Sequence, residues 1–307
     1  MITLEQFLLA INSNFKSAID TKSICIVRHA MDQRNDNDWY GFDELLKFNQ
    51  RVLARFTAEQ PRDIFNNANI VLVFVADGST RCVLRGAFSC HGKISRIEFL
   101  EDYIDVDFKY SSFLRSKGIV QSDNTDRYYY NIEEIDFMHP LYNRVVIDWG
   151  LAARSWVQYK LDKEVWEIRP KGFISNFPGW EDLFISHQEL TAIMAAPEGN
   201  KDWYQFLSEH DGVYVILDTI DGKHYVGSAY GALGIWGRWK GYCETGHNHN
   251  IGLIELLSKD PSRNEHFRYS LHHVCTKTSK SAQEVLRYEG LLKMKLASRG
   301  EIGFNKN

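Results

Sequence analysis

The sequence lacks the features of membrane-spanning and secreted proteins. Its longest uninterrupted apolar run is Ile70 to Ala76, far short of the roughly 20 residues that a membrane-spanning helix needs. The opening MITLEQFLLAINSNF has no basic segment before its apolar stretch and carries Glu5 within that stretch, which argues against a secretory signal. We therefore expect a cytoplasmic protein without a transmembrane helix.

Paired cysteines are also lacking. The five cysteines are widely spaced and form no CxxC pair, so no zinc knuckle or redox motif is expected. Reduced and mostly buried thiols are the simplest interpretation. Cys82, Cys90 and His91 could in principle share a metal, although a zinc site normally shows tighter paired spacing.

The chain has no excess of charge, Gly or Pro. Its net charge is −4, and hydrophobic residues make up 44% of its 307 residues, which excludes a disordered or low-complexity chain. Residues 201–307 hold 14 Lys and Arg against 12 Asp and Glu, together with seven of the eleven histidines. The length favours two domains. We place them at residues 1–200 and 201–307, with AAPEGNKDW around Asn200 as the linker.

The first domain is predicted to be strand-rich and mixed α+β. A helix is expected over residues 43–56, and another from Ser186 to Met194 with a serine cap. Short strand-like runs follow one another between residues 69 and 168, which suggests a curved sheet or small barrel. The expected strands are 24–27, two runs around the turn Asp77-Gly78, 94–100, 103–108, 127–132, 145–149 and 164–168.

The second domain shows a clearer succession of strands, turns and helices. Strands at 212–217 and 223–227 flank the turn dipeptide Asp221-Gly222, so they should pair as a hairpin. A third strand is expected at 266–274. Helices are expected around 238–243, at 250–257 and at 281–298. This order predicts a small antiparallel three-stranded sheet flanked by helices, so the whole chain belongs to the α/β (α+β) class.

Two tripeptides in the second domain carry the functional signal. Gly212-Val213-Tyr214 and Tyr225-Val226-Gly227 are separated by ten residues, and the pair resembles the signature of the GIY-YIG nucleases at its usual spacing. The resemblance covers about residues 211–305 and includes an Arg on the following helix, a Glu on the last long helix and an Asn near the end. With average residue usage, two such tripeptides arise by chance with odds on the order of one in ten thousand.

The resemblance implies a metal-dependent DNA endonuclease, a phosphodiesterase, with DNA as its partner. It implies that Glu289 holds one divalent cation, Mg²⁺ or another such as Mn²⁺, and that Tyr214 orients or deprotonates the attacking water. It further implies that Arg238 stabilises the transition state, Tyr225 orders the site and Asn305 braces it. Free Tyr has a pKa near 10, which favours a proton relay through Tyr214 over a standing phenolate.

Three features depart from this pattern or compete with it. Ten residues separate Gly227 from Arg238, more than in the most compact family members. Several members carry a His one helical turn after the Arg, where this chain has Tyr242, and His247 or His249 could substitute as general acid or base. Arg268 and Arg287 are other cationic candidates, and the two motif tyrosines could be ordinary strand residues.

The first domain resembles no family that we can name. Its strand-rich part interleaves aromatic side chains with arginines, which would suit stacking on an extruded or modified base, although core packing explains most of them. These residues are Tyr128, Tyr129, Tyr130, Trp149 and Trp156 with Arg144, Arg154 and Arg169. The acidic balance of the domain counts against binding duplex phosphates.

The leading hypothesis is a restriction or phage-defence nuclease with an N-terminal target-recognition domain. A DNA repair nuclease is the near alternative. A nucleic-acid-binding regulator could keep the fold without catalysis, although the intact motif residues argue against this. A protein-interaction scaffold would show no divalent-metal dependence. The oligomeric state stays open, with a homodimer among the options.

Overall fold

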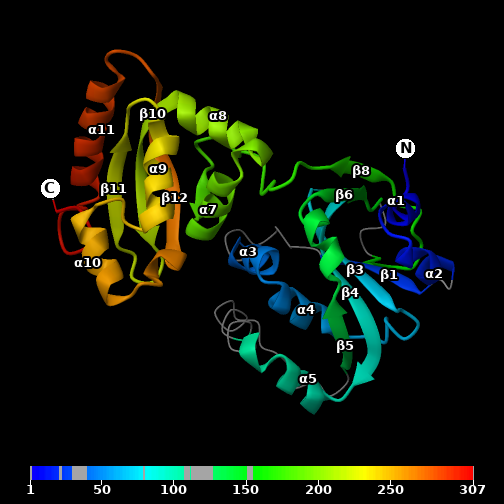
Figure 1. The fold of residues 1–307 in the computed structure, drawn as a ribbon. Coiled ribbons are helices and arrows are strands. Elements are labelled where there is room, and N and C mark those ends of the chain that lie inside the picture. Colours follow the sequence, from blue (N-terminus) through cyan, green and yellow to red (C-terminus); the bar gives the residue numbers. More distant parts are fainter. Residues whose placement is uncertain are drawn as a thin grey trace. The chain divides into compact units, whose positions relative to one another are not determined.

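The computed structural model describes residues 2–20, 23–29, 40–78, 80–106, 111, 127–150 and 155–306. The chain divides into two compact units, Met1–Arg169 and Pro170–Asn307, and the mixture of helices and sheets in both confirms the expected α+β class (Figure 1). Among the described residues, no helix has the length and apolarity needed to cross a membrane.

The first unit is built on an eight-stranded mixed sheet. Its main path runs β2-β5-β4-β3-β1-β7; β6 branches from β4, and β8 pairs with β6. Only β1 and β3 among the described pairs run parallel. A curved sheet or a small barrel was expected over residues 69–168, and because this path has two ends, the described strands form an open, branched sheet rather than a barrel. The strands are β1 (Ile24–His29), β2 (Glu59–Gln60), β3 (Ile70–Ala76), β4 (Arg81–Ile94), β5 (Tyr128–Glu134), β6 (Val145–Asp148), β7 (Val157–Gln158) and β8 (Val165–Ile168).

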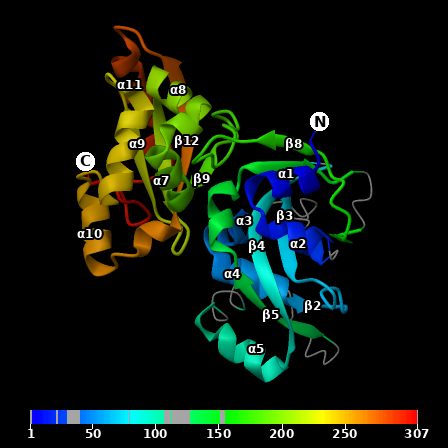
Figure 2. The same cartoon turned by 45° about the vertical axis from the view of Figure 1, so that its right-hand side comes forward.

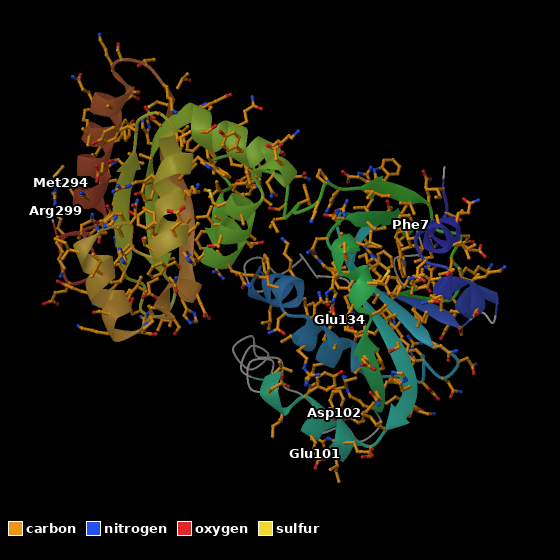
Figure 3. All side chains as sticks on the ribbon, in the orientation of Figure 1. Phe7, Glu101, Asp102, Glu134, Met294 and Arg299 are labelled. Carbon is orange, nitrogen blue, oxygen red and sulfur yellow. The ribbon has the colours of Figure 1, made fainter. Side chains whose placement is uncertain are left out.

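Helices cover both faces of this sheet. On one face lie α1 (Leu4–Ile11) and α2 (Asn14–Asp20). Phe7 of α1, labelled in Figure 3, is buried in the hydrophobic core between these helices and the sheet. The other face packs against α3 (Tyr40–Phe48), α4 (Gln50–Ala58) and α5 (Arg96–Asp102). A 3₁₀ helix, η1, spans Asp136–Leu141.

Helix caps explain where two local predictions were wrong. The expected helix over 43–56 is two helices, because the Asn49 side chain accepts a hydrogen bond from Val52 N at 3.1 Å and begins α4 anew. The expected strand at 94–100 is largely α5, which a reciprocal capping box between Ser95 and Glu98 begins. No strand begins at Tyr103, which follows α5, and the end of the run expected at 103–108 lies outside the described residues.

The second unit has a four-stranded antiparallel sheet in the order β11-β10-β12-β9. The three expected strands are β10 (His210–Asp218), β11 (His224–Ala229) and β12 (Phe267–Thr276). The fourth is β9 (Phe184–Ser186), which the sequence pattern did not predict and which Figure 2 shows beside β12. The three predicted strands are therefore present, and the described sheet contains β9 as a fourth strand.

Helices also cover both faces of this second sheet. The tyrosine-rich face packs against α7 (His187–Ala195), α8 (Lys201–Glu209), α9 (Gly234–Thr245) and α10 (Ile251–Lys259). The valine-rich face packs against α11 (Ser281–Lys295), whose labelled Met294 lies on its outer side and is 66% exposed (Figure 3). Short 3₁₀ helices are η2 (Pro197–Gly199) and η3 (Arg263–His266).

The segment expected to link the domains is packed into the second unit. Asn200 is 1% exposed, and its side chain accepts a hydrogen bond from Ile174 N at 2.9 Å and donates one to Gly172 O at 2.8 Å. Trp203 Nε1 donates to Ser175 O at 2.8 Å. Residues 170–200 therefore pack with the second unit, and the division lies about one strand and one helix earlier than the sequence suggested.

Candidate active site

The two motif tyrosines lie on the same face of the second sheet. Tyr214 on β10 and Tyr225 on β11 belong to the core under α9, whereas Val213 and Val226 face α11, as the two-residue alternation of strands requires. Gly227 is paired directly opposite Tyr214. A Cβ on Gly227 would stand 2.4 Å from the Tyr214 hydroxyl oxygen, so only glycine leaves room for that hydroxyl.

Helix α9 brings two further side chains to the Tyr214 hydroxyl. Arg238 Nε donates a hydrogen bond to it at 3.2 Å, and the Tyr242 hydroxyl lies 3.0 Å away. Arg238 and Tyr242 are four residues apart and so project from the same side of the helix. We call Tyr214, Tyr225, Arg238 and Tyr242 the tyrosine–arginine cluster.

Burial controls the protonation of this cluster. Tyr214 and Tyr242 are fully buried, and that burial raises the pKa of each phenol well above its ordinary value, with the neighbouring Tyr225 adding to the effect. Both phenols are therefore protonated at neutral pH, and one donates to the other. The cluster can pass or orient a proton, but it is poorly suited to hold a phenolate.

The predicted metal ligand lies on the opposite face of the sheet. On α11, Glu289 Oε2 accepts a hydrogen bond from Ser228 Oγ at 2.6 Å, and Oε1 pairs with Lys293 Nζ at 2.9 Å. Among the described residues, no hydrogen bond or ion pair joins Glu289 to the tyrosine–arginine cluster. Both groups nevertheless contact neighbouring residues of β11, because Tyr214 lies over Gly227 and Glu289 bonds Ser228. Since β11 is an edge strand, a substrate that contacts both must lie around this edge.

Glu289 can hold a divalent cation only in competition with Lys293. An ionised carboxylate has about four lone-pair sites, so the bonds to Ser228 and Lys293 leave acceptor capacity for an ion. Mg²⁺ suits one carboxylate completed by water and substrate phosphate. The ammonium group of Lys293 opposes a second cation beside it. The residues therefore fit an ion that arrives together with a negatively charged phosphate.

Asn305 supports the strand from its outer edge. Its Oδ1 accepts from Val226 N at 2.9 Å and its Nδ2 donates to Val226 O at 2.8 Å. These are the bonds that another strand would make. The side chain is 1% exposed, and Phe304 N donates to His224 O at 2.9 Å beside it. Asn305 thus positions β11 from outside the tyrosine–arginine cluster.

The other polar candidates lie elsewhere. In the loop after α9, Asn248 Nδ2 donates to Arg238 O at 3.0 Å, which folds that loop against the helix. His247 Nδ1 accepts from His249 N at 3.1 Å, and neither ring hydrogen-bonds to a described residue of the cluster. Arg287 lies over the Tyr288 ring on α11, away from the face that carries Tyr214.

The aromatic residues proposed to read a base mostly serve the core of the first unit. Tyr130 and Trp149 are fully buried, and Tyr128 is the most exposed of the five, beside Lys93. Arg169 pairs with Asp77 and Glu167, and Arg154 lies outside the described residues. These observations favour packing over an open pocket.

The candidate metal group of the first unit is not assembled. Cys82 packs in the core under α1 and α2, whereas Cys90 packs in the core on the opposite face. Strand β4 carries both residues, but a single ion cannot reach through the sheet. Cys25, Cys82 and Cys90 are buried free thiols, and Cys243 and Cys275 are half-buried free thiols.

Three partners of the site are not predicted by the sequence. Tyr242 was noted only as a departure, and neither Ser228 nor Lys293 was singled out. The available signal was spacing, since Tyr242 follows Arg238 and Lys293 follows Glu289 by four residues, which puts each pair on one helix face. Ser228 gave no signal, because its role depends on where α11 packs.

No protein-family model matches the chain, and no curated protein matches it. One solved structure, a mutant of the catalytic domain of the intron endonuclease I-TevI, is similar to 32% of this chain and 94% of its own length, with 24% identity and a TM-score of 0.26. At this TM-score the likeness carries no conclusion about function.

Proposed function

We propose that the second unit is a metal-dependent endonuclease that hydrolyses DNA phosphodiester bonds, and that the protein acts in restriction or phage defence. The observation that carries the proposal is the hydrogen bond from Arg238 Nε to the Tyr214 hydroxyl at 3.2 Å. It joins a permanent cation to a phenol of the paired motif, beside the edge strand β11.

Each chemical need of hydrolysis has a residue at this edge. The guanidinium of Arg238 keeps donors beyond the one used on Tyr214, and these can grip a phosphate and stabilise the charge that develops on it. The protonated Tyr214 hydroxyl orients the attacking water and relays a proton with Tyr242. Glu289 would hold Mg²⁺ or Mn²⁺, which when bound supplies electrostatic stabilisation of the phosphate and a more acidic water. Tyr225 keeps the cluster packed.

The first unit is proposed to select the target. Everything that the phosphodiester chemistry needs lies after Pro170, and a small catalytic unit has little surface of its own for choosing a DNA. The first unit has a separate sheet and its own cores, so recognition and hydrolysis can reside in different parts of the chain.

Plasmid cleavage with matched variants tests the proposal. We expect the full chain to nick or cut plasmid DNA, modified or unmodified, only when Mg²⁺ or Mn²⁺ is added. Glu289→Gln keeps the shape and the bond to Ser228 but removes the charge, so cleavage should be lost while DNA binding survives. The control is Glu255→Gln, an exposed carboxylate paired with Lys306. Cleavage by Glu289→Gln at the wild-type rate would exclude the metal assignment.

A DNA-binding regulator without catalysis is the second candidate. It is favoured by one observation, the ion pair in which Lys293 already neutralises Glu289 at 2.9 Å. In that case the same experiment gives DNA binding that is indifferent to Mg²⁺ and no cleavage under any condition. A repair nuclease would instead cleave damaged or branched DNA in preference to intact plasmid.

A further inference from the structure

A second group of metal-binding side chains lies on the α11 face of the second sheet. His273 and Cys275 are two residues apart on β12 and so point to the same face, and Glu284 faces them from α11. The ligand atoms of the three lie within 4.8 Å of one another. Nothing in the proposed nuclease chemistry uses these residues.

The surrounding contacts hold two of these ligands in place. His273 Nε2 lies 2.9 Å from Glu284 Oε1. Its ring stacks on Tyr288 with the centroids 3.7 Å apart and an interplanar angle of 7°. The ring therefore has a fixed orientation, and Glu284 is directed to the same point. Cys275 is half-buried beside them against the Val213 and Val285 core.

A buried carboxylate adds negative charge to this region. Asp211 is paired directly opposite Cys275 and is 3% exposed. Its Oδ2 accepts from Ser281 Oγ at 2.6 Å, while its Oδ1 has no hydrogen-bond partner among the described residues. A buried carboxylate oxygen without a partner is costly, and a nearby cation would reduce that cost. This orphaned oxygen is evidence independent of the three ligands.

We propose that His273, Cys275 and Glu284 bind a Zn²⁺ ion, with water at the fourth position. Zinc accepts nitrogen, thiolate sulfur and carboxylate oxygen together, at about 2.0–2.3 Å in tetrahedral geometry. Ligand atoms in such a site are about 3.3–3.7 Å apart, so the side chains need to close by at most about 1.5 Å through small side-chain rotations. Mg²⁺ and Ca²⁺ are disfavoured, because hard cations take oxygen ligands.

The zinc would tie the end of β12 to the first turns of α11. That helix carries Glu289 five residues after Glu284, so the ion would fix the position of the helix against the sheet. Binding requires the Cys275 thiol to lose its proton, and the proton leaves to solvent as the sulfur–zinc bond forms. The inference does not depend on the nuclease activity.

Metal content and cobalt spectroscopy of the full chain test this site. After chelation and dialysis, we expect the wild type to take up one equivalent of Zn²⁺ in competition with a chromophoric chelator. With Co²⁺ as the probe, a sulfur-to-cobalt charge-transfer band should appear in the near ultraviolet. Cys275→Ser should remove that band, and Cys275→Ser and His273→Asn should each weaken Zn²⁺ binding by more than about 100-fold, because even outer-shell partners are worth about 10- to 100-fold.

Matched controls are available for each ligand. Cys243→Ser replaces the other half-buried thiol, and His272→Asn replaces the neighbouring histidine, whose ring bonds Ser270. Both should bind Zn²⁺ as the wild type does, and so should Glu289→Gln, which separates this site from the proposed nuclease metal. A wild type without stoichiometric Zn²⁺, or without the cobalt–sulfur band, would overturn the proposal, as would unchanged binding by Cys275→Ser. The wild-type cobalt spectrum decides the matter even where a variant folds poorly.

Discussion

The hydroxyl oxygens of Tyr214 and Tyr242 lie 3.0 Å apart in a fully buried position, with Arg238 Nε bonded to the first of them. This contact joins β10 to α9 and closes the core over the paired motif. It also places a permanent cation beside two phenols that burial keeps protonated. Both the stability and the proposed chemistry of the second unit should depend on it.

The two phenols should be energetically coupled. Tyr214→Phe and Tyr242→Phe each delete one hydroxyl and leave the other with a missing partner, so each should cost about 1–3 kcal/mol of unfolding free energy. The double variant should cost less than the sum, with an interaction of about 0.5–3 kcal/mol. Urea unfolding of the four proteins measures this, and strict additivity would show that the hydroxyls do not share a hydrogen bond.

Tyr214→Phe should also slow plasmid cleavage by roughly 10²- to 10⁴-fold, the usual range for a group that transfers a proton. Tyr269→Phe is the matched control, because Tyr269 is another fully buried tyrosine whose hydroxyl bonds His187 Nδ1 at 2.9 Å. It should lose similar stability with its cleavage rate unchanged. Equal rates for the two variants would identify Tyr214 as a core residue only.

Lys293→Met should strengthen divalent-cation binding at Glu289. Removing the ammonium leaves a largely buried carboxylate without its counter-charge, so the variant should be less stable in the absence of metal. Mg²⁺ should restore that stability and bind roughly 10-fold more tightly than in the wild type, equal to about 1.4 kcal/mol. Thermal unfolding against Mg²⁺ concentration measures both effects. The control is the exposed Lys295→Met, and an identical Mg²⁺ response in both variants would argue against a cation at Glu289.

The unit boundary predicts which fragment folds. A fragment of residues 170–307 keeps β9, α7 and the hydrogen bonds of Asn200 and Trp203, whereas residues 200–307 lose all of them. Circular dichroism and urea unfolding should therefore show a cooperative transition for the longer fragment alone.

On genomic DNA, the fragment of residues 170–307 should cut with less preference for particular sites than the full chain. Identical digestion patterns would place target selection in the catalytic unit.

Acid should destabilise the second unit through His187. Its Nε2 lies 3.1 Å from Asn264 Nδ2, and burial lowers the pKa of the ring from 6.5 to about 4. The unfolded chain takes up a proton near its ordinary pKa while the folded ring stays neutral. The contribution of His187 to the free energy of unfolding is therefore fully present above pH 6.5. It falls as the pH drops toward 4, by up to about 1.4 kcal/mol per pH unit. His187→Gln should flatten this slope in urea titrations, and an unchanged slope would contradict the assignment.

The sequence by itself determined the parts of this protein that depend on local pattern. The strands at 210–218 and 224–229, the helix carrying Arg238 and the long helix carrying Glu289 follow from alternation, apolar spacing and turn residues within short windows. Tyr214 and Tyr225 lie on the same face because Tyr225 is two residues from Gly227, the residue that pairs with Tyr214, and side chains two residues apart on a strand point to the same face. Where a cap competed with an apolar run, as at Ser95, the local pattern was ambiguous and the strand prediction failed.

Tertiary packing alone decided the rest. No local signal places β9 beside β12, buries Asn200 against residue 172, or puts Glu289 across the sheet from Tyr214 with Ser228 as its partner. The same holds for His273, Cys275 and Glu284, which come from a strand and a helix and meet only after α11 packs. Such contacts join residues far apart in sequence, and their geometry depends on how whole elements bury their apolar faces rather than on the preferences of any short segment.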